Sequence, residues 1–251
     1  MVCRPVTRVA VFGAAGRLGS AVCAAVEDAD DLELVARVGS ADSRDGAVGA
    51  DVAVDVTRPD AVLDNVRWCV DHGMHVVVGT SGFDDERLDT VRGWLASQPE
   101  LGVLVVPNFS VGAVLMMAFA VQAAPFFESV EVVEAHHPDK VDAPSGTARR
   151  TAQLIAEARK GAGLEPVPDA TRDDPDGARG ARVDGVSVHS LRLRGVAAAQ
   201  EVLLGGPGET LSIRHGSHDR AAYMPGVLAA IRAVPTLPGL TVGLEAVLGL
   251  D

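Results

Sequence analysis

Short apolar runs alternate with amphipathic stretches along the first part of the chain. Their spacing predicts buried strands at residues 8–12, 32–38, 51–56, 75–78 and 102–106, and helices at 20–27, 60–72 and 84–97. This alternation is typical of a parallel, doubly wound sheet with helices on both faces. Ligands of such sheets bind at the carboxyl ends of the strands, so we expect a site there.

The pattern changes after residue 110. A helix at 111–124 leads to a short apolar strand at Val132 and Val133, and another helix follows at 146–160. Residues 161–185 are rich in Gly, Pro, Asp and Arg, which predicts a flexible surface loop that could serve as a lid. Next come strand-like runs at 186–194, 198–204 and 210–215, a helix at 217–234 and a strand at 240–244. The sequence thus predicts an α/β protein with an N-terminal Rossmann-like doubly wound parallel sheet and a second α+β domain with a mostly antiparallel sheet.

A glycine-rich turn joins the first predicted strand to the first helix. Residues 13–19 read Gly-Ala-Ala-Gly-Arg-Leu-Gly, with GxxGxxG spacing rather than GxGxxG. In dinucleotide-binding proteins such glycines allow the tight turn, the approach of backbone to pyrophosphate and the packing of helix on strand. A plain tight turn would look similar, but the flanking strand and helix favour dinucleotide binding. Arg17 could face the adenine, a phosphate or solvent.

The carboxyl ends of later strands carry turn residues that could line a binding cleft. They are Asp55-Val-Thr57, Gly79-Thr-Ser-Gly82 and Pro107-Asn-Phe-Ser110. Each could be only a loop, but several at one sheet edge favour a cleft whose amides hold a carboxamide or a sugar.

The acidic residue that often binds the ribose at the end of the second strand is missing. Val38 is followed by Gly39 and Ser40. A carboxylate there would repel a 2′-phosphate, whereas Arg37, Ser40 and Arg17 could favour one. Asp42 could replace the acid from further along the loop, so the residues leave NADH against NADPH open, with NADPH favoured.

Composition excludes some classes of function. With 251 residues and 25.9 kDa, the chain exceeds the usual size of one domain, which favours two. A net charge of −12, a pI near 5.0 and 4% aromatic residues argue against nucleic-acid binding. No signal-peptide core follows the N-terminus, and the most apolar run, 111–127, falls short of the ~20 residues of a membrane span. The scattered Cys3, Cys23 and Cys69 indicate reduced thiols. We therefore expect a cytoplasmic protein that binds neither nucleic acid nor membrane.

Residues 131–148 concentrate groups that can exchange protons. The stretch contains His136, His137, Lys140 and Asp142, and then a Pro-Ser-Gly-Thr turn that opens a helix. Only two of the 22 basic residues are lysines, Lys140 and Lys160, and a lysine can give up a proton where an arginine cannot. The N-terminus of the following helix provides free amides and the positive end of the dipole, which suit a carboxylate. Asp142 could orient Lys140 or shape the turn, and Ser145 could be an ordinary N-cap.

Two His-x-x-His pairs have a spacing that is found in metal sites. They are His72 with His75 and His215 with His218. Neither has nearby cysteines or a convincing third ligand, so no metal is predicted.

Taken together, these motifs resemble the 4-hydroxy-tetrahydrodipicolinate reductase (dihydrodipicolinate reductase) family. The likeness extends from Val9 to Leu244, and the Glu134–Thr147 motif is its most specific part. The resemblance implies NAD(P)H-dependent reduction of 4-hydroxy-tetrahydrodipicolinate with loss of water, in lysine and diaminopimelate biosynthesis. It also implies a homotetramer, a dicarboxylate substrate and NADPH or NADH as cofactor. The dinucleotide-binding domain would comprise residues 1–107 and 218–251, and the substrate-binding and oligomerisation domain residues 108–217.

The resemblance also assigns roles to residues. His136 and Lys140 would be catalytic, and His137, Gly146 and Thr147 would bind substrate. The cofactor would be held by Gly13, Ala14, Ala15, Gly16, Arg17, Leu18, Gly79, Thr80, Ser81, Val106, Pro107, Asn108 and Phe109. The departure is Gly39, where family members commonly have an acidic residue, and it puts NADH preference in doubt.

Two other functions fit parts of the pattern. Another two-domain reductase of amino-acid metabolism, such as an aspartate or homoserine dehydrogenase, would not need the His-His-x-x-Lys loop. A nucleotide-sensing regulatory module would bind cofactor without turnover and leaves that loop unexplained.

Overall fold

The chain folds into two compact units in the computed structural model, which describes residues 6–250. Unit 1 contains residues up to 111 and residues from 220 onward, and unit 2 contains residues 112–219. Unit 2 is therefore an insertion between two stretches of chain that fold together. The functions predicted for the two domains stay predictions.

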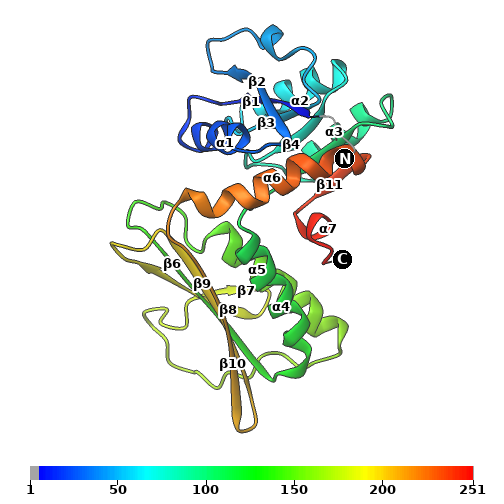
Figure 1. The fold of residues 1–251 in the computed structure, drawn as a ribbon. Helices are drawn as coiled ribbons and strands as arrows, with labels where there is room; N and C mark the ends of the chain where they lie inside the picture. Colours follow the sequence, from blue (N-terminus) through cyan, green and yellow to red (C-terminus); the bar gives the residue numbers. More distant parts are fainter. Residues whose placement is uncertain (1–5, 251) are drawn as a thin grey trace. The chain divides into compact units, whose positions relative to one another are not determined.

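Unit 1 is built on a parallel sheet of six strands with the order β11-β5-β4-β3-β1-β2. Figure 1 labels all of these strands except β5. The strands are β1 (Thr7–Phe12), β2 (Leu32–Val38), β3 (Val52–Asp55), β4 (His75–Val78), β5 (Gly102–Val105) and β11 (Gly239–Val242). β3 and β5 are buried at every position, because helices cover both faces of a doubly wound sheet. The predicted Rossmann-like sheet is confirmed.

Helices divide between the two faces of this sheet. From β1 the chain moves one way to β2 through α1 (Arg17–Glu27), and from β3 it moves the other way through α2 (Val62–Asp71) and α3 (Asp85–Leu95). Right-handed crossovers in opposite directions place α1 on one face and α2 and α3 on the other. The residues that α2 and α3 bury, among them Val66, Val70 and Val91, form one core cluster with alternate residues of the strands. Helix α6 (Met224–Ala233) packs against α1.

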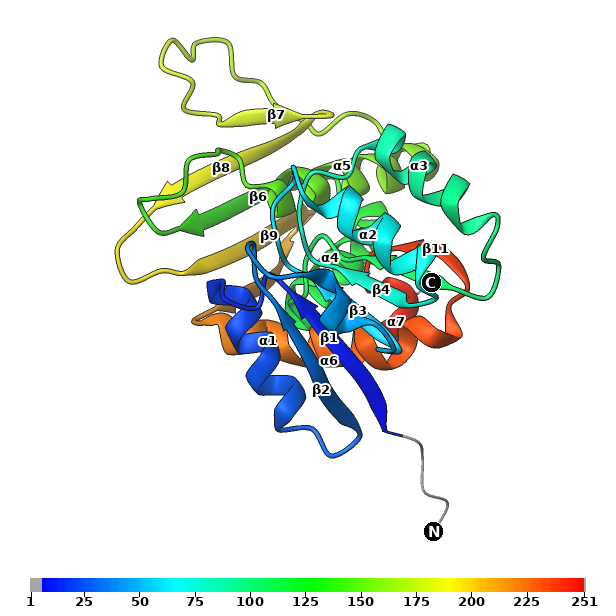
Figure 2. The ribbon, with the colours of Figure 1, turned by 90° about the horizontal axis from the view of Figure 1, so that it is seen from above.

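Unit 2 contains a five-stranded sheet with the order β10-β9-β6-β8-β7. Its strands are β6 (Ser129–His136), β7 (Ala181–Val183), β8 (Val186–Arg192), β9 (Ala198–Gly206) and β10 (Glu209–Ser217). Among these, β6 and β8 pair in parallel and the other pairs are antiparallel, so the mostly antiparallel sheet is confirmed. Figure 2 shows β7, β8, β6 and β9 side by side, and Figure 1 shows β9 and β10 as a long hairpin. Helix α5 (Gly146–Gly161) packs Ala148, Ala152 and Ile155 into one core cluster with strands of this sheet, and helix α4 (Val111–Ala123) adds Ala120 to that cluster.

Several element boundaries differ from the sequence predictions. The last long helix starts at Met224 rather than at residue 217, because β10 continues to Ser217, a 3-10 turn intervenes, and Pro225 suits the first turn of a helix. The region predicted as loop at 161–185 contains β7, which joins β8 through Asp184 and Gly185, both at positive φ as a two-residue hairpin turn requires. Short elements that the pattern did not predict are η1 (Arg44–Ala47), η2 (Ala124–Phe126), η3 (Arg220–Tyr223), η4 (Val234–Thr236) and α7 (Glu245–Leu248).

Across residues 6–250, the helices are all too short or too polar to cross a membrane.

A half-buried histidine links two strands of unit 1. The Nδ1 atom of His75, at the start of β4, accepts a hydrogen bond of 2.9 Å from the backbone N–H of Gly102, at the start of β5. Burial, opposed by the charge of Asp51, holds the pKa of His75 below its ordinary value of 6.5. The folded state therefore favours the neutral ring that can accept this bond.

We predict that this histidine makes unit 1 less stable in mild acid. Because its pKa is lower in the folded state, the stabilisation is complete above about pH 6.5 and is lost as the pH falls towards the folded-state pKa. His75→Asn keeps an acceptor atom but does not titrate, so the variant should lose less unfolding free energy than wild type between about pH 6.5 and 5. Urea denaturation over this range measures the effect, with the exposed His137→Asn as control. Equal slopes for all three proteins would contradict the prediction.

Candidate active site

The glycine turn after β1 is shaped for close packing. Gly13 has φ of +83°, and a Cβ atom there would lie 2.7 Å from the carbonyl oxygen of Val56. A Cβ atom on Gly19 would collide with the carbonyl oxygen of Gly13. Both positions therefore require glycine, one for the turn and one for the packing of α1 on it.

The first turn of α1 follows directly on this loop. Its N-cap is Gly16, and in the described part of the chain no side chain caps the helix. The amides at a helix N-terminus attract anions, and Gly16 at the N-cap has no side chain to compete for them. The loop and the start of α1 thus fit the pyrophosphate of a dinucleotide, as the sequence predicts for Gly13 to Leu18.

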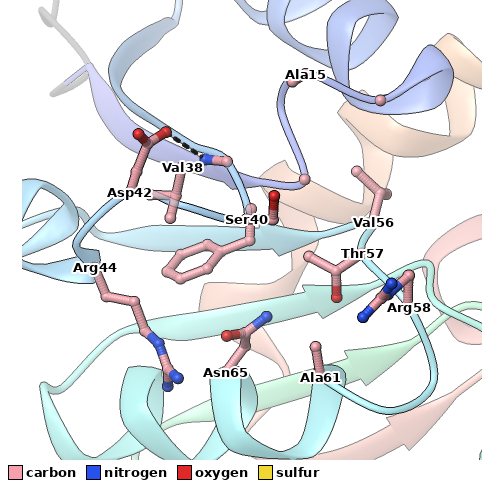
Figure 3. A pocket seen from close by; sticks show the side chains of 14 residues that line it. Ala15, Val38, Ser40, Asp42, Arg44, Val56, Thr57, Arg58, Ala61 and Asn65 are labelled. Carbon is pink, nitrogen blue, oxygen red and sulfur yellow. Dashed lines mark hydrogen bonds between the residues drawn. The ribbon is translucent and has the colours of Figure 1, made fainter.

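A cavity of about 530 Å³ opens beside the glycine turn (Figure 3). It is bounded by the turn, by the end of β2 and by the loop that leads from β3 into α2. The residues that line it are Phe12, Gly13, Ala15, Gly16, Val38, Gly39, Ser40, Asp42, Arg44, Val56, Thr57, Arg58, Ala61 and Asn65. The cavity thus contains three of the predicted cofactor residues, and Ala14, Arg17 and Leu18 lie outside its lining.

Charged residues of both signs lie at the end of β2, where the ribose of a dinucleotide would be bound. The carboxylate of Asp42 accepts a hydrogen bond of 2.8 Å from the N–H of Gly39 (Figure 3). Arg37 pairs with Glu27 at 2.7 Å, so its charge is already compensated. Arg44, which sequence reasoning missed, lines the cavity and donates to the carbonyl of Asp64 at 2.9 Å. A survey of cations in the whole loop after the second strand would have found it.

The two other predicted cofactor segments lie together at the same sheet edge. They follow the neighbouring strands β4 and β5, and Val106 donates its N–H to Val78 at 2.8 Å. The ring of Phe109 lies so close to Gly79 that a side chain at Gly79 would collide with it. The side chain of Asn108 accepts a bond of 2.9 Å from the N–H of Ser110. Pro107 and Ser81 are exposed, and none of these residues lines the cavity.

A buried carboxylate that sequence reasoning treated only as a turn residue lies at the end of β3. Asp55 is 1% exposed. It accepts hydrogen bonds from the hydroxyl of Thr80 at 2.6 Å, from the N–H and hydroxyl of Thr57 at 3.1 and 2.8 Å, and from the amide of Asn65 at 2.8 Å. It therefore links a predicted cofactor residue, Thr80, to two residues of the cavity wall.

In unit 2, the predicted catalytic histidine is held by a second buried carboxylate. Glu134 faces the core from β6 and is completely buried. Its Oε2 atom lies 2.6 Å from Nδ1 of His136, and Arg192 on β8 donates to both carboxylate oxygens at 3.0–3.1 Å. The N–H of Ser145 adds a bond of 3.2 Å. Burial would raise the pKa of Glu134, but hydrogen bonds from Arg192, Ser190 and His136 outweigh it and hold the pKa below 4.5.

This arrangement determines which nitrogen of His136 can react. A carboxylate only accepts hydrogen bonds, so Nδ1 carries the proton that faces Glu134. Nε2 is then the nitrogen available for proton transfer. Sequence reasoning missed Glu134 and Arg192, although a carboxylate in register with the buried Val130 and Val132 on a strand was a usable signal.

The loop after β6 brings the predicted lysine to an aspartate. Lys140 Nζ lies 2.7 Å from Asp142, and this bond from Lys140 lowers the pKa of Asp142 below 3.8. Arg192 donates to the carbonyl of Asp142 at 2.6 Å, which ties the loop to β8. Of the two roles open for Asp142, pairing with Lys140 is the one observed.

The loop ends at the N-terminus of α5. Ser145 is the N-cap, and its hydroxyl accepts a bond of 3.2 Å from the N–H of Ala148, as an ordinary cap does. Gly146 is exposed and Thr147 is half-buried in the first turn, while His137 is exposed on the loop. The three predicted substrate residues thus lie on one loop and helix start, together with His136 and Lys140.

The first of the two His-x-x-His pairs, His72 with His75, has other partners. His72 contacts the carbonyl of Trp68 at 2.7 Å, and Nδ1 of His75 is bonded to Gly102. Within residues 6–250 there is no group of three His, Cys, Asp or Glu side chains placed to hold a metal ion. Cys23 and Cys69 are free and buried, and Cys3 lies outside the described residues.

Known proteins match both units. The family described as dihydrodipicolinate reductase, N-terminus, matches residues 7–109, and its C-terminal counterpart matches residues 112–248. A 4-hydroxy-tetrahydrodipicolinate reductase of Cutibacterium acnes is 62% identical over 97% of this chain and 99% of its own length, and one of Nocardia farcinica is 60% identical with the same coverage.

Solved structures agree with this match. A dipicolinate-bound dihydrodipicolinate reductase from Paenisporosarcina sp. TG-14 superposes with a TM-score of 0.85 at 36% identity, covering 96% of this chain and 99% of that one. A probable dehydrogenase from Thermotoga maritima has a TM-score of 0.60 at 13% identity, covering 97% of this chain and 93% of that one, which shows a shared fold alone.

We predict that the Glu134 cluster dominates the stability of β6. Removal of one partner leaves buried charge uncompensated, so Glu134→Ala should reduce the unfolding free energy by about 3–5 kcal/mol. Glu131→Ala on the same strand removes a half-exposed carboxylate that pairs with Arg179 and His189, and should cost about 1 kcal/mol or less. Urea denaturation of both variants measures the difference. Equal losses would show that the buried cluster has no special weight.

Proposed function

Because the chain belongs to the dihydrodipicolinate reductase family, we propose that it reduces 4-hydroxy-tetrahydrodipicolinate to tetrahydrodipicolinate, with loss of water and oxidation of NAD(P)H. This step belongs to lysine and diaminopimelate biosynthesis. The observation that supports it most directly is the Glu134-held His136 beside Lys140 and the N-terminus of α5. Family membership favours this reductase over an aspartate or homoserine dehydrogenase and over a regulatory module.

The two units have different parts in this function. Residues 1–107 and 218–251 bind the dinucleotide, and residues 108–217 bind substrate and assemble the protein into a homotetramer in the cytoplasm. The glycine turn, the open start of α1 and the cavity beside them support the first assignment. The second is supported by the cationic groups around α5.

The substrate is a cyclic imine with two carboxylates. His137, Gly146 and Thr147 bind a carboxylate at the start of α5, where the amides and the positive end of the helix dipole favour an anion. Lys140 and Arg192 each pair with a carboxylate, Asp142 and Glu134, so the attraction for an anion comes chiefly from the backbone amides at the start of α5. A dicarboxylate ligand suits this seat better than a neutral sugar or alcohol.

Protons are needed at two points of the reaction. Loss of the hydroxyl as water leaves a conjugated ring, to which a dihydronicotinamide held in unit 1 would supply hydride. One proton accompanies the departing hydroxyl, and another must reach carbon of the resulting enamine. His136 transfers protons through Nε2, with its Nδ1–H held by Glu134. Lys140 is the second donor, and Asp142 positions its ammonium.

The end of β2 favours NADPH at least as much as NADH. Gly39 places no carboxylate at the ribose, and one oxygen of Asp42 is occupied by the N–H of Gly39. Ser40 and Arg44 line the cavity and can donate to a 2′-phosphate, as can Arg17 from the first turn of α1.

We predict large losses of turnover from His136→Gln and Lys140→Ala. Loss of a proton donor should reduce kcat by roughly 10²–10⁴-fold, while the affinity for NADPH stays unchanged because the cofactor residues lie in unit 1. Consumption of NADPH with freshly generated product of dihydrodipicolinate synthase measures kcat, and fluorescence titration measures cofactor affinity. Lys160→Ala and His72→Gln are matched controls, since both residues are exposed and lie outside the loop. Near wild-type turnover by both test variants would refute the assignment.

We predict that Gly39→Asp reverses the cofactor preference. Wild type should use NADPH at least as well as NADH, and a carboxylate at residue 39 should lower the ratio of kcat/KM for NADPH over NADH by about tenfold or more. Gly39→Asn is the control, because a Cβ atom at this position lies 2.9 Å from Asp42 in either variant and only the charge differs. A strong NADH preference in wild type would instead show that Asp42 replaces the missing acid.

A further inference from the structure

The carboxylate of Asp55 is surrounded by hydrogen-bond donors. Thr80, Thr57 and Asn65 together supply four donors, three of which reach Oδ1 and one Oδ2. The side chain is 1% exposed, and among the described residues no Lys, Arg or His forms an ion pair with it. Its charge is balanced by neutral dipoles alone.

These bonds dictate which way each neighbouring group points its donors and acceptors. A carboxylate only accepts hydrogen bonds, so the hydroxyls of Thr57 and Thr80 must donate their protons to it. The amide of Asn65 must likewise turn its NH₂ towards Asp55. What remains for other partners is acceptor capacity: the lone pairs of the Thr57 hydroxyl and the carbonyl oxygen of the Asn65 amide.

Thr57 and Asn65 form one wall of the cavity (Figure 3). In a sheet of this type the pyrophosphate lies on the glycine turn and the ribose at the end of β2. The Gly13–Gly16 turn and the Gly39–Asp42 loop take up those two sides of the cavity, which leaves the Thr57–Asn65 wall for the base. Arg44 and Arg58 also border the cavity, but their guanidinium groups suit phosphates.

Resting on the proposed dinucleotide site, we propose that Asp55 is a positioning residue that makes this wall a hydrogen-bond acceptor and so selects a base with an exocyclic amine, adenine, over one with a carbonyl, hypoxanthine. Adenine presents an NH₂ donor where hypoxanthine presents an oxygen. An oxygen facing the Asn65 carbonyl and the Thr57 lone pairs would leave acceptors opposed without a proton between them.

The negative charge of Asp55 extends beyond its hydrogen-bond partners. Burial, together with the charge of Asp55, raises the pKa of the Cys69 thiol to about 12. A negative charge behind the wall adds to its preference for donors and against phosphate.

The test compares the Kd of NADH with that of deamino-NADH, which carries hypoxanthine in place of adenine. Wild type should bind NADH roughly 3- to 10-fold more tightly, the worth of about one hydrogen bond. In Asp55→Asn the new NH₂ faces Asn65, whose amide must turn over and present its own NH₂ to the cavity. The Kd ratio should then fall to about 1 or below.

A double variant tests polarity separately from packing. Asp55→Asn with Asn65→Asp exchanges the two groups, so the carboxylate at residue 65 accepts from residue 55 and again presents an oxygen to the cavity. The wild-type ratio should return. A purely structural role for Asp55 would change stability, measured by thermal melting, but not the ratio.

Further variants keep the inference testable if Asp55→Asn does not fold. Thr57→Val removes one acceptor and leaves Asp55 two other side-chain partners, and Thr57→Ser keeps the hydroxyl. The ratio should fall in the first and persist in the second. An equal ratio in wild type and all folded variants would overturn the inference, whereas failure of wild type to bind either NADH or NADPH would overturn the proposed function itself.

Discussion

The arrangement of unit 2 depends on keeping one carboxylate charged inside an apolar core. Burial of Glu134 costs several kcal/mol unless partners compensate it. Those partners come from three places, namely Arg192 on β8, His136 at the end of β6 and the N–H of Ser145 before α5. Because all three must meet one side chain, the strand, the loop and the helix start are fixed together. The orientation of the imidazole is a direct result of this requirement.

Unit 1 uses the same device with a different balance of charge. Asp55, like Glu134, lies at or near the carboxyl end of a buried strand and is saturated with hydrogen bonds. Glu134 is neutralised by Arg192, whereas Asp55 is met by hydroxyls and amides and keeps its negative charge. The cluster around Glu134 therefore orients His136 and presents no open acceptor. The wall in front of Asp55 instead suits neutral groups that donate hydrogen bonds.

The period of apolar residues was enough to predict the sheet of unit 1, since β2 and β4 begin and end where the pattern places them. The local sequence pattern predicted less where the structure depends on contacts between residues far apart in the chain. Nothing near Glu134 in the sequence identifies Arg192, 58 residues away, as its partner. The Asp184–Gly185 turn was a readable hairpin signal within a region whose composition indicated loop. The start of α6 was misplaced because residues 218–223, which lie between β10 and α6, form a bend and the 3-10 turn η3 rather than α-helix.

The insertion of unit 2 has a consequence for biosynthesis. Strand β11 completes the first sheet by pairing with β5, and α6 packs on α1, where Arg232 donates to Asp31 at 2.7 Å. Both elements leave the ribosome only after all of unit 2 has emerged. Until then β5 is an open sheet edge, with unpaired backbone groups of the kind that recruit other chains. Strand β11 is thus added to the sheet late, and its loss would destabilise unit 1, most of which is synthesised first, rather than unit 2.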